Sequence, residues 1–108
     1  MDLVTRGEIW LVNLDPTVGS EIRKTRPCVV VSPSEMHNHL HTVLVAPMTS
    51  AGREAPFRIG VNHGGRKGLI LLDQMRAVDK TRLVKKMGAV SAKTLTATLA
   101  TLQEVFEE

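Results

Sequence analysis

The most informative part of the sequence is Gly19-Ser20-Glu21-Ile22-Arg23-Lys24-Thr25-Arg26-Pro27. Gly19 tolerates a positive φ and so allows a tight loop, whereas Pro27 biases Arg26 toward an extended conformation. The apolar run after Pro27 predicts a strand, and we therefore expect Arg26 at the base of a loop where a strand begins. Glu21 beside several cations suits phosphate binding and proton transfer, although an exposed, solvated loop often has the same composition.

On both sides of this loop, short apolar runs separated by Gly and Pro predict strands. We expect strands at residues 9–14, 28–32, 42–46, 57–61, 69–72 and 84–90. Beyond them the apolar period becomes helical, because Leu95, Leu99, Leu102 and Phe106 share one helical face, and Ser91 is a suitable N-cap. Short strands followed by one helix predict a mainly β protein, a small antiparallel barrel with a C-terminal α-helix.

Length and composition limit the class of protein. The 108 residues indicate a single domain, residues 1–108, with a modest core. A net charge of +3 and a pI near 9.4 are compatible with a nucleic-acid partner, and the scarcity of aromatic residues argues against a platform of stacked rings. The single cysteine, Cys28, is expected to be a small buried hydrophobe. With no signal-peptide pattern and no long apolar run, we expect a cytoplasmic protein without membrane contact.

Thr49 and Ser50 follow the strand predicted at residues 42–46 and a proline. If this strand neighbours the one that begins after Pro27, Thr49 and Arg26 face the same rim of the barrel. The alternative is an ST-turn, in which the hydroxyl groups bond only to nearby backbone.

Asp73, Gln74 and Arg76 follow the most apolar of the predicted strands. A carboxylate, an amide and a guanidinium at such a place could read bases and hold phosphate. The same residues could instead form a structural Asp–Arg pair that anchors the next turn. The sequence contains neither a phosphate-binding P-loop motif nor the short signatures of serine hydrolases and zinc proteases.

Three histidines alternate in a polar segment, residues 35–41, that is predicted to be a loop or a short turn. On a strand, His37, His39 and His41 would share one face, as metal ligands can. Glu35 is the only nearby residue that could complete such a set, and His63 stands alone in a glycine-rich turn, so we expect no metal site. The role of the three alternating histidines stays open.

Four short motifs, in this order, resemble the MazF/PemK family of bacterial toxins, the endoribonucleases of type II toxin–antitoxin systems. The motifs are Gly7-Glu8-Ile9-Trp10, Asp15-Pro16-Thr17-Val18-Gly19-Ser20-Glu21 with Arg26-Pro27, Val45-Ala46-Pro47-Met48-Thr49, and Leu72-Asp73-Gln74-Met75-Arg76-Ala77-Val78-Asp79. Each motif is short, but together they cover nearly the whole chain. One departure is Leu71, where some members place an arginine two residues before the aspartate.

The resemblance implies an SH3-like barrel with a C-terminal helix, a homodimer and an acidic, MazE-like antitoxin as partner. It implies sequence-selective cleavage of single-stranded RNA without metal or cofactor, leaving a 2′,3′-cyclic phosphate and a 5′-hydroxyl. The catalytic residues carried over are Arg26, Thr49 and the loop carboxylate Glu21. The residues expected to bind substrate are Gly19, Ser20, Lys24, Ser50, Arg53, Asp73, Gln74 and Arg76.

The residue chemistry suggests a division of roles. Arg26 suits the stabilisation of charge on the phosphate, because a guanidinium stays protonated, and Thr49 suits alignment of the reacting groups. Glu21 could accept a proton or read a base.

Two other classes of protein remain open. One is a CcdB-like poison of DNA gyrase on the same barrel, against which the ending Phe106-Glu107-Glu108 counts, and the other is an SH3-like interaction module without activity.

Overall fold

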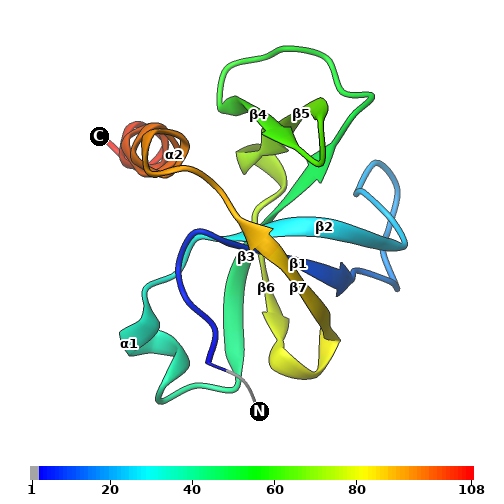
Figure 1. Cartoon of the computed structure of the whole chain (residues 1–108), viewed down its shortest axis with the longest axis vertical. Helices are drawn as coiled ribbons and strands as arrows, with labels where there is room; N and C mark the ends of the chain where they lie inside the picture. Colours follow the sequence, from blue (N-terminus) through cyan, green and yellow to red (C-terminus); the bar gives the residue numbers. More distant parts are fainter. Residues whose placement is uncertain (1–2) are drawn as a thin grey trace.

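The computed structural model describes residues 3–108, in which seven antiparallel strands form a curled sheet and a helix follows at the C-terminal end (Figure 1). The strands are β1 (Glu8–Asn13), β2 (Thr25–Val30), β3 (Thr42–Thr49), β4 (Arg58–His63), β5 (Arg66–Leu71), β6 (Arg76–Asp79) and β7 (Leu83–Ala89). The helices are α1 (Ser34–His37) and α2 (Ala92–Val105), with 3-10 turns at Leu72–Gln74 and Lys80–Arg82. The predicted mainly β architecture is confirmed.

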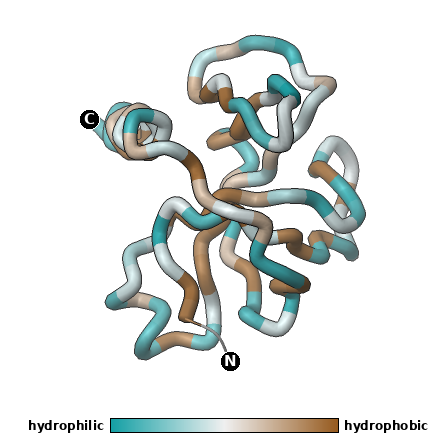
Figure 2. The backbone as a smooth tube through the Cα atoms, viewed as in Figure 1, coloured by the Kyte–Doolittle hydropathy of each residue, from teal (hydrophilic) through white to brown (hydrophobic). Residues whose placement is uncertain are grey.

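The sheet follows the order β4-β5-β3-β2-β1-β7, and β6 pairs with β3 away from this path. The sheet therefore curls into a half-barrel, with the β4–β5 hairpin at one end and α2 beside that hairpin (Figure 1). Hydrophobic residues gather along the strands that cross at the centre, while the outer loops are mostly hydrophilic (Figure 2).

Strand β3 is the longest strand, and it contacts three others. Thr42 to Val45 pair with β6, Val45 to Pro47 pair with β2, and Met48 and Thr49 pair with β5. Pro47 lies between the residues that pair with β6 and those that pair with β5. Because a proline has no N–H to donate to a ladder, it fits the point at which a strand changes partner.

Two groups of buried apolar side chains fill the half-barrel, and β3 contributes to both. The first comprises Val4, Trp10, Val12, Leu14, Cys28, Val30, Val43, Val45 and Val78. The second comprises Ile9, Val29, Val31, Ala46, Met48, Val61, Ile70 and Leu72. Alternate residues of one strand point to opposite faces, so β3 can supply Val43 and Val45 to one group and Ala46 and Met48 to the other.

The C-terminal helix forms as its sequence predicts. The Ser91 hydroxyl oxygen accepts a hydrogen bond from the Thr94 N–H at 3.1 Å, which confirms the expected N-cap. Leu102 packs against the second group of apolar side chains. Phe106 follows the last helical residue and stays 71% exposed, so it does not extend the buried face of the helix.

The structure also corrects several element boundaries. Strand β2 begins at Thr25, earlier than expected, and Leu72 belongs to a 3-10 turn instead of a strand. Strand β6 was not predicted, because Val78 is its only buried residue and its identity as a strand depends on pairing with β3. One turn of helix, α1, occupies part of the segment predicted to be a loop or short turn.

Cys28 is fully buried in β2, as expected. Burial raises the pKa of its thiol to about 12, although the nearby Arg76 charge opposes that shift. The thiol therefore stays protonated at neutral pH and acts as a small apolar side chain, not as a nucleophile.

Glu8 is a buried carboxylate that connects β1 to its surroundings. Its Oε1 accepts hydrogen bonds from the Thr5 N–H at 2.7 Å and the Trp10 Nε1–H at 3.2 Å, and its Oε2 lies 2.7 Å from Lys86 Nζ on β7. Burial opposes ionisation of Glu8, but the bonds from Lys86, Thr5 and Trp10 together outweigh it and hold the pKa below its usual 4.5. Ionised Glu8 therefore stabilises the folded state.

We predict that Glu8→Gln lowers the free energy of unfolding by about 1–3 kcal/mol at pH 7, because hydrogen bonds to a charged group are lost. Since the folded-state pKa is depressed, this contribution is complete above the unfolded pKa and disappears as the pH falls below about 4.5. Urea unfolding at a series of pH values measures it. Glu104→Gln, at an exposed position of α2, is the control, and a difference independent of pH would contradict the prediction.

Candidate functional site

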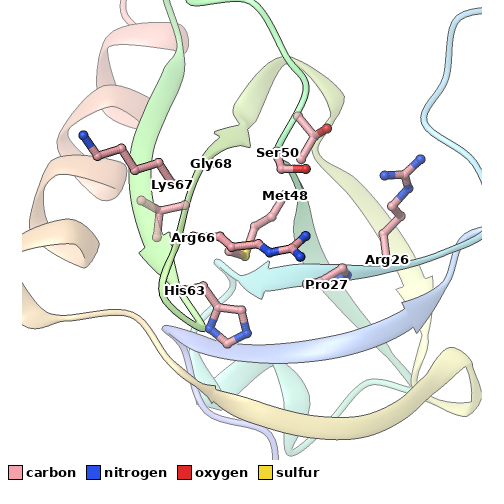
Figure 3. Close-up of a pocket in the computed structure, with 10 residues that line it drawn as sticks. Arg26, Pro27, Met48, Ser50, His63, Arg66, Lys67 and Gly68 are labelled. Carbon is pink, nitrogen blue, oxygen red and sulfur yellow. The ribbon is translucent and has the colours of Figure 1, made fainter.

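A cavity of about 200 Å³ lies where β2, the end of β3 and the β4–β5 hairpin meet (Figure 3). Its lining consists of Arg26, Pro27, Met48, Thr49, Ser50, Val61, His63, Arg66, Lys67 and Gly68. We call it the Arg26 pocket. Strands β2 and β3 are neighbours in the sheet, which was the condition for Arg26 and Thr49 to share one rim of the barrel, and they do share it. Three of the predicted site residues, Arg26, Thr49 and Ser50, therefore come together here.

The β4–β5 hairpin supplies the other polar side chains of this pocket. Gly64 and Gly65 both have positive φ, which allows the tight turn, and His63 pairs directly with Arg66. Opposite residues of an antiparallel pair lie on the same face, and this face continues into buried Val61. Figure 3 shows the Arg66 guanidinium extending into the pocket.

Gly68 allows β5 to approach the end of β3. A Cβ atom at this position would lie only 2.8 Å from the Thr49 carbonyl oxygen, so any larger residue would push the strands apart. The absence of a side chain at Gly68 therefore permits the close approach of β5 to Thr49 beside the pocket.

Two local hydrogen bonds orient the predicted catalytic groups. Arg26 Nε–H donates to the Arg23 carbonyl oxygen at 3.2 Å, which leaves the terminal nitrogens of the guanidinium available to a ligand. The Thr49 hydroxyl oxygen accepts from the Ala51 N–H at 3.2 Å. The ST-turn considered from the sequence therefore forms, and the Thr49 hydroxyl can still donate its own proton outward.

A second cavity, of about 360 Å³, lies between the loop before β2 and the turn after β5. Its lining consists of Ser20, Glu21, Ile22, Asp73, Gln74, Met75 and Arg76, and we call it the Gln74 pocket. Gln74 Oε1 accepts from the Ile22 N–H at 2.7 Å, and Arg76 Nη1 donates to the Leu14 carbonyl oxygen at 3.0 Å. These bonds fasten the loop to the strand exit.

Glu21 belongs to the Gln74 pocket and does not line the Arg26 pocket. Its Oε1 accepts from the Val18 N–H at 2.6 Å, so the carboxylate also shapes the turn in which it lies. Glu21 and Arg26 are close in sequence, but they face different cavities.

Asp73 forms a structural ion pair, although not with the arginine that the sequence suggested. Its two carboxylate oxygens accept from Arg58 Nε–H and Nη2–H, both at 3.1 Å, whereas Arg76 points to the backbone of Leu14. The hydrogen bonds from Arg58 lower the pKa of Asp73 more than its partial burial raises it. Asp73 stays ionised and anchors β4 to the turn after β5.

The remaining predicted residues lie in exposed loops and line neither cavity. Gly19 has the positive φ that its position suggested, and Lys24 also adopts a positive φ while its N–H donates to Asp15 Oδ1 at 3.1 Å. Arg53 lies between β3 and β4, where its carbonyl oxygen accepts from Arg58 Nη1–H at 3.0 Å.

His37, His39 and His41 do not form a row of ligands. His37 is buried after one turn of helix, with Nδ1 bonded to the Val4 carbonyl oxygen at 2.9 Å and Nε2 to the Ser32 hydroxyl at 2.5 Å. Because a carbonyl only accepts, the proton belongs on Nδ1, and Nε2 accepts from Ser32. His39 and His41 are exposed, and residues 3–108 contain no group of three or more His, Cys, Asp or Glu arranged to hold a metal ion.

His63, Arg66 and Lys67 are site residues that were not predicted from the sequence. A signal was available, because the alternation of Phe57, Ile59 and Val61 extends to residue 63 on the same face. That alternation does not show that the hairpin lines the same cavity as Arg26.

Within the described residues, no helix combines the length and apolar character needed to cross a membrane.

The chain is similar to known proteins in sequence and in fold. The chain is 36% identical over 106 residues to endoribonuclease PemK of Escherichia coli, covering 93% of this chain and 80% of PemK. A crystal structure of MazF from Deinococcus radiodurans has the same fold, with a TM-score of 0.85, 23% identity and coverage of 97% of both chains. A MazE–MazF structure from that organism has a TM-score of 0.78 and 21% identity, covering 97% of this chain and 96% of that chain.

The match to a family model is nearly complete along the sequence. The model describes the PemK-like, MazF-like toxin of type II toxin–antitoxin systems and matches residues 5–106. The match includes β1 through α2, with both cavities described above. The chain therefore belongs to the PemK-like, MazF-like family of type II toxin–antitoxin toxins.

Proposed function

We propose that this protein is an endoribonuclease toxin that cleaves single-stranded RNA at selected sequences. The observation that carries the proposal is the Arg26 pocket, where two guanidinium groups and the Thr49 hydroxyl line one open cavity. Such a site suits a phosphodiester, because guanidinium groups bind phosphate oxygens through paired donors. The name of the PemK relative, an endoribonuclease, supports RNA cleavage over poisoning of gyrase and over an inactive interaction module.

The reaction requires no nucleophile from the protein, because the RNA 2′-hydroxyl attacks the adjacent phosphate. This attack leaves a 2′,3′-cyclic phosphate and a 5′-hydroxyl. Arg26 stabilises the charge that develops on the phosphate oxygens, and Thr49 aligns the reacting groups. With two arginines to neutralise that charge, the mechanism requires neither a metal ion nor a cofactor.

The Gln74 pocket serves to recognise bases. Asp73, Gln74 and Arg76 contribute the carboxylate, amide and guanidinium groups that read base edges, and Glu21 and Ser20 approach from the opposite loop. Since Glu21 lines this cavity, its role in recognition is favoured over the role of general base. Of the other residues expected to bind substrate, Ser50 lines the Arg26 pocket, and Gly19, Lys24 and Arg53 lie in exposed loops that an RNA strand can contact.

Two protein partners complete the proposal. Exposed apolar side chains, among them Phe106 at 71%, Val84 at 59% and Met87 at 37%, support a homodimer. The MazE–MazF relative, together with the cationic loop that contains Arg23 and Lys24, supports an acidic MazE-like antitoxin that docks by charge complementarity. Residues 1–108 act as one toxin domain in the cytoplasm, a compartment that suits a single free cysteine.

For the Arg26 pocket, we predict that Arg26→Ala lowers kcat by on the order of a hundred- to a thousand-fold, as expected for loss of one preorganised donor. Arg26→Lys should restore little, because the forked geometry is lost, and Thr49→Ala should be less impaired. The assay follows cleavage of a single-stranded oligoribonucleotide in excess EDTA, with analysis of the product ends.

Lys85→Ala, which removes an exposed cation on β7, is the matched control for that assay. Activity that disappears in EDTA and returns with magnesium, or products with 5′-phosphates, would overturn the mechanism.

For the Gln74 pocket, we predict that Glu21→Gln and Gln74→Ala raise KM and change the cleaved sequence, with little change in kcat. Glu21→Gln keeps an oxygen that can accept from the Val18 N–H, so the turn is preserved while the charge is lost. Steady-state kinetics and sequencing of cleaved total RNA measure both effects. A large fall in kcat with unchanged KM for Glu21→Gln would instead identify Glu21 as the base.

For the assembly, we predict that light scattering at micromolar concentration gives twice the chain mass of 11.8 kDa. Addition of the acidic antitoxin encoded beside this toxin should then inhibit cleavage, with an affinity that falls as salt is added. A monomer mass would refute the homodimer, and inhibition that is insensitive to salt would refute the electrostatic mode of docking.

A further inference from the structure

The RNA reaction needs a group that removes the proton of the 2′-hydroxyl, and most residues of the Arg26 pocket cannot do so. The guanidinium groups of Arg26 and Arg66 and the ammonium group of Lys67 are hydrogen-bond donors without an acceptor atom. The hydroxyls of Thr49 and Ser50 are poor bases. Pro27, Met48, Val61 and Gly68 have no basic side chain. The one remaining lining residue is His63.

His63 has the position and freedom that this task demands. It ends β4 opposite Arg66 in the hairpin register, half-buried, on the face of the hairpin that covers the pocket (Figure 3). The ring of His37 has both nitrogens bonded, to Val4 and Ser32, whereas the His63 ring makes no hydrogen bond to any residue in 3–108. Both of its nitrogens are therefore free to meet a substrate.

The surrounding charges organise a phosphate next to this imidazole. Arg26 approaches from β2, Arg66 and Lys67 come from β5, and Thr49 contributes a hydroxyl from β3. Figure 3 shows the Arg66 guanidinium directed into the pocket and the Lys67 amine directed away from it. A phosphate bound by Arg26 and Arg66 would lie in the cavity that His63 also lines.

We propose that His63 is the general base of the RNA-cleavage reaction, a role that rests on the proposed function above. Imidazole is the side chain that exchanges a proton between about pH 5 and 8, which fits a base working near neutrality. The carboxylate named from the family resemblance, Glu21, lines the other pocket.

The step balances without a further reactant. Neutral His63 takes the 2′-hydroxyl proton as the 2′-oxygen forms a bond to phosphorus and the bond from phosphorus to the 5′-oxygen breaks. The leaving 5′-oxygen takes a proton from the surrounding water, since the pocket is open to solvent, and His63 later returns its proton to the water. Arg26 and Arg66 stay protonated throughout and stabilise the charge on the two free phosphate oxygens.

The test is the pH dependence of cleavage of a short single-stranded oligoribonucleotide in excess EDTA, for wild type, His63→Gln and His39→Gln. For wild type, kcat should rise with pH, because a general base must be unprotonated to accept the proton. His63→Gln should lack this rise and be on the order of a hundred- to ten-thousand-fold slower at its plateau. Its affinity for a 2′-deoxy analogue and its unfolding temperature should match wild type.

His39→Gln removes an exposed histidine outside both pockets and should keep the wild-type profile. If His63→Gln retains the rate and the rise with pH, His63 is not the base. A wild-type kcat that falls with pH, with that fall lost in His63→Gln, would make His63 an acid and also overturn the proposal. Failure of wild type to cleave RNA, or products with 5′-phosphates, would overturn the proposed function itself, which separates the two outcomes.

Discussion

The pairing of β3 with three other strands is the constraint on which the rest of the structure depends. Its first half pairs with β6, its middle pairs with β2, and its end pairs with β5. Strand β3 thereby connects β6, β2 and β5 within the curled sheet, and it supplies side chains to both apolar groups. Pro47 marks the change of partner, because it withdraws one N–H from the ladder where the neighbours change.

The same pairing explains why the polar residues divide between two cavities. The end of β3 carries Thr49 to the rim where β2 presents Arg26, and Gly68 lets β5 close against it. The turn after β5 meets the loop before β2 from the other side, where Gln74 holds the backbone of Ile22. The Arg26 pocket, which is cationic, suits charge stabilisation, and the Gln74 pocket, which has mixed polar groups, suits base recognition. An RNA strand that occupies both would be read at one cavity and cut at the other.

Much of the architecture could be predicted because it depends on local patterns. The positive φ of Gly19, the N-cap at Ser91 and the burial of Cys28 each follow from the residue and its immediate neighbours, and each is confirmed. The apolar runs located most of the strands, with boundary errors of a few residues where the runs have polar ends. The selection of Arg26 and Thr49 as catalytic residues came from the family resemblance, and their shared rim was expected only if their strands were neighbours.

By itself, then, the sequence determined the mainly β class, the terminal helix and the family resemblance. Only the tertiary structure decided which distant residues meet. It gave Asp73 its partner Arg58, paired β6 with β3, and brought His63 of the β4–β5 hairpin to the cavity that Arg26 also lines. The physical reason is that local patterns reflect backbone preferences and periodicity, whereas these meetings follow from strand register and close approach between segments far apart in the chain.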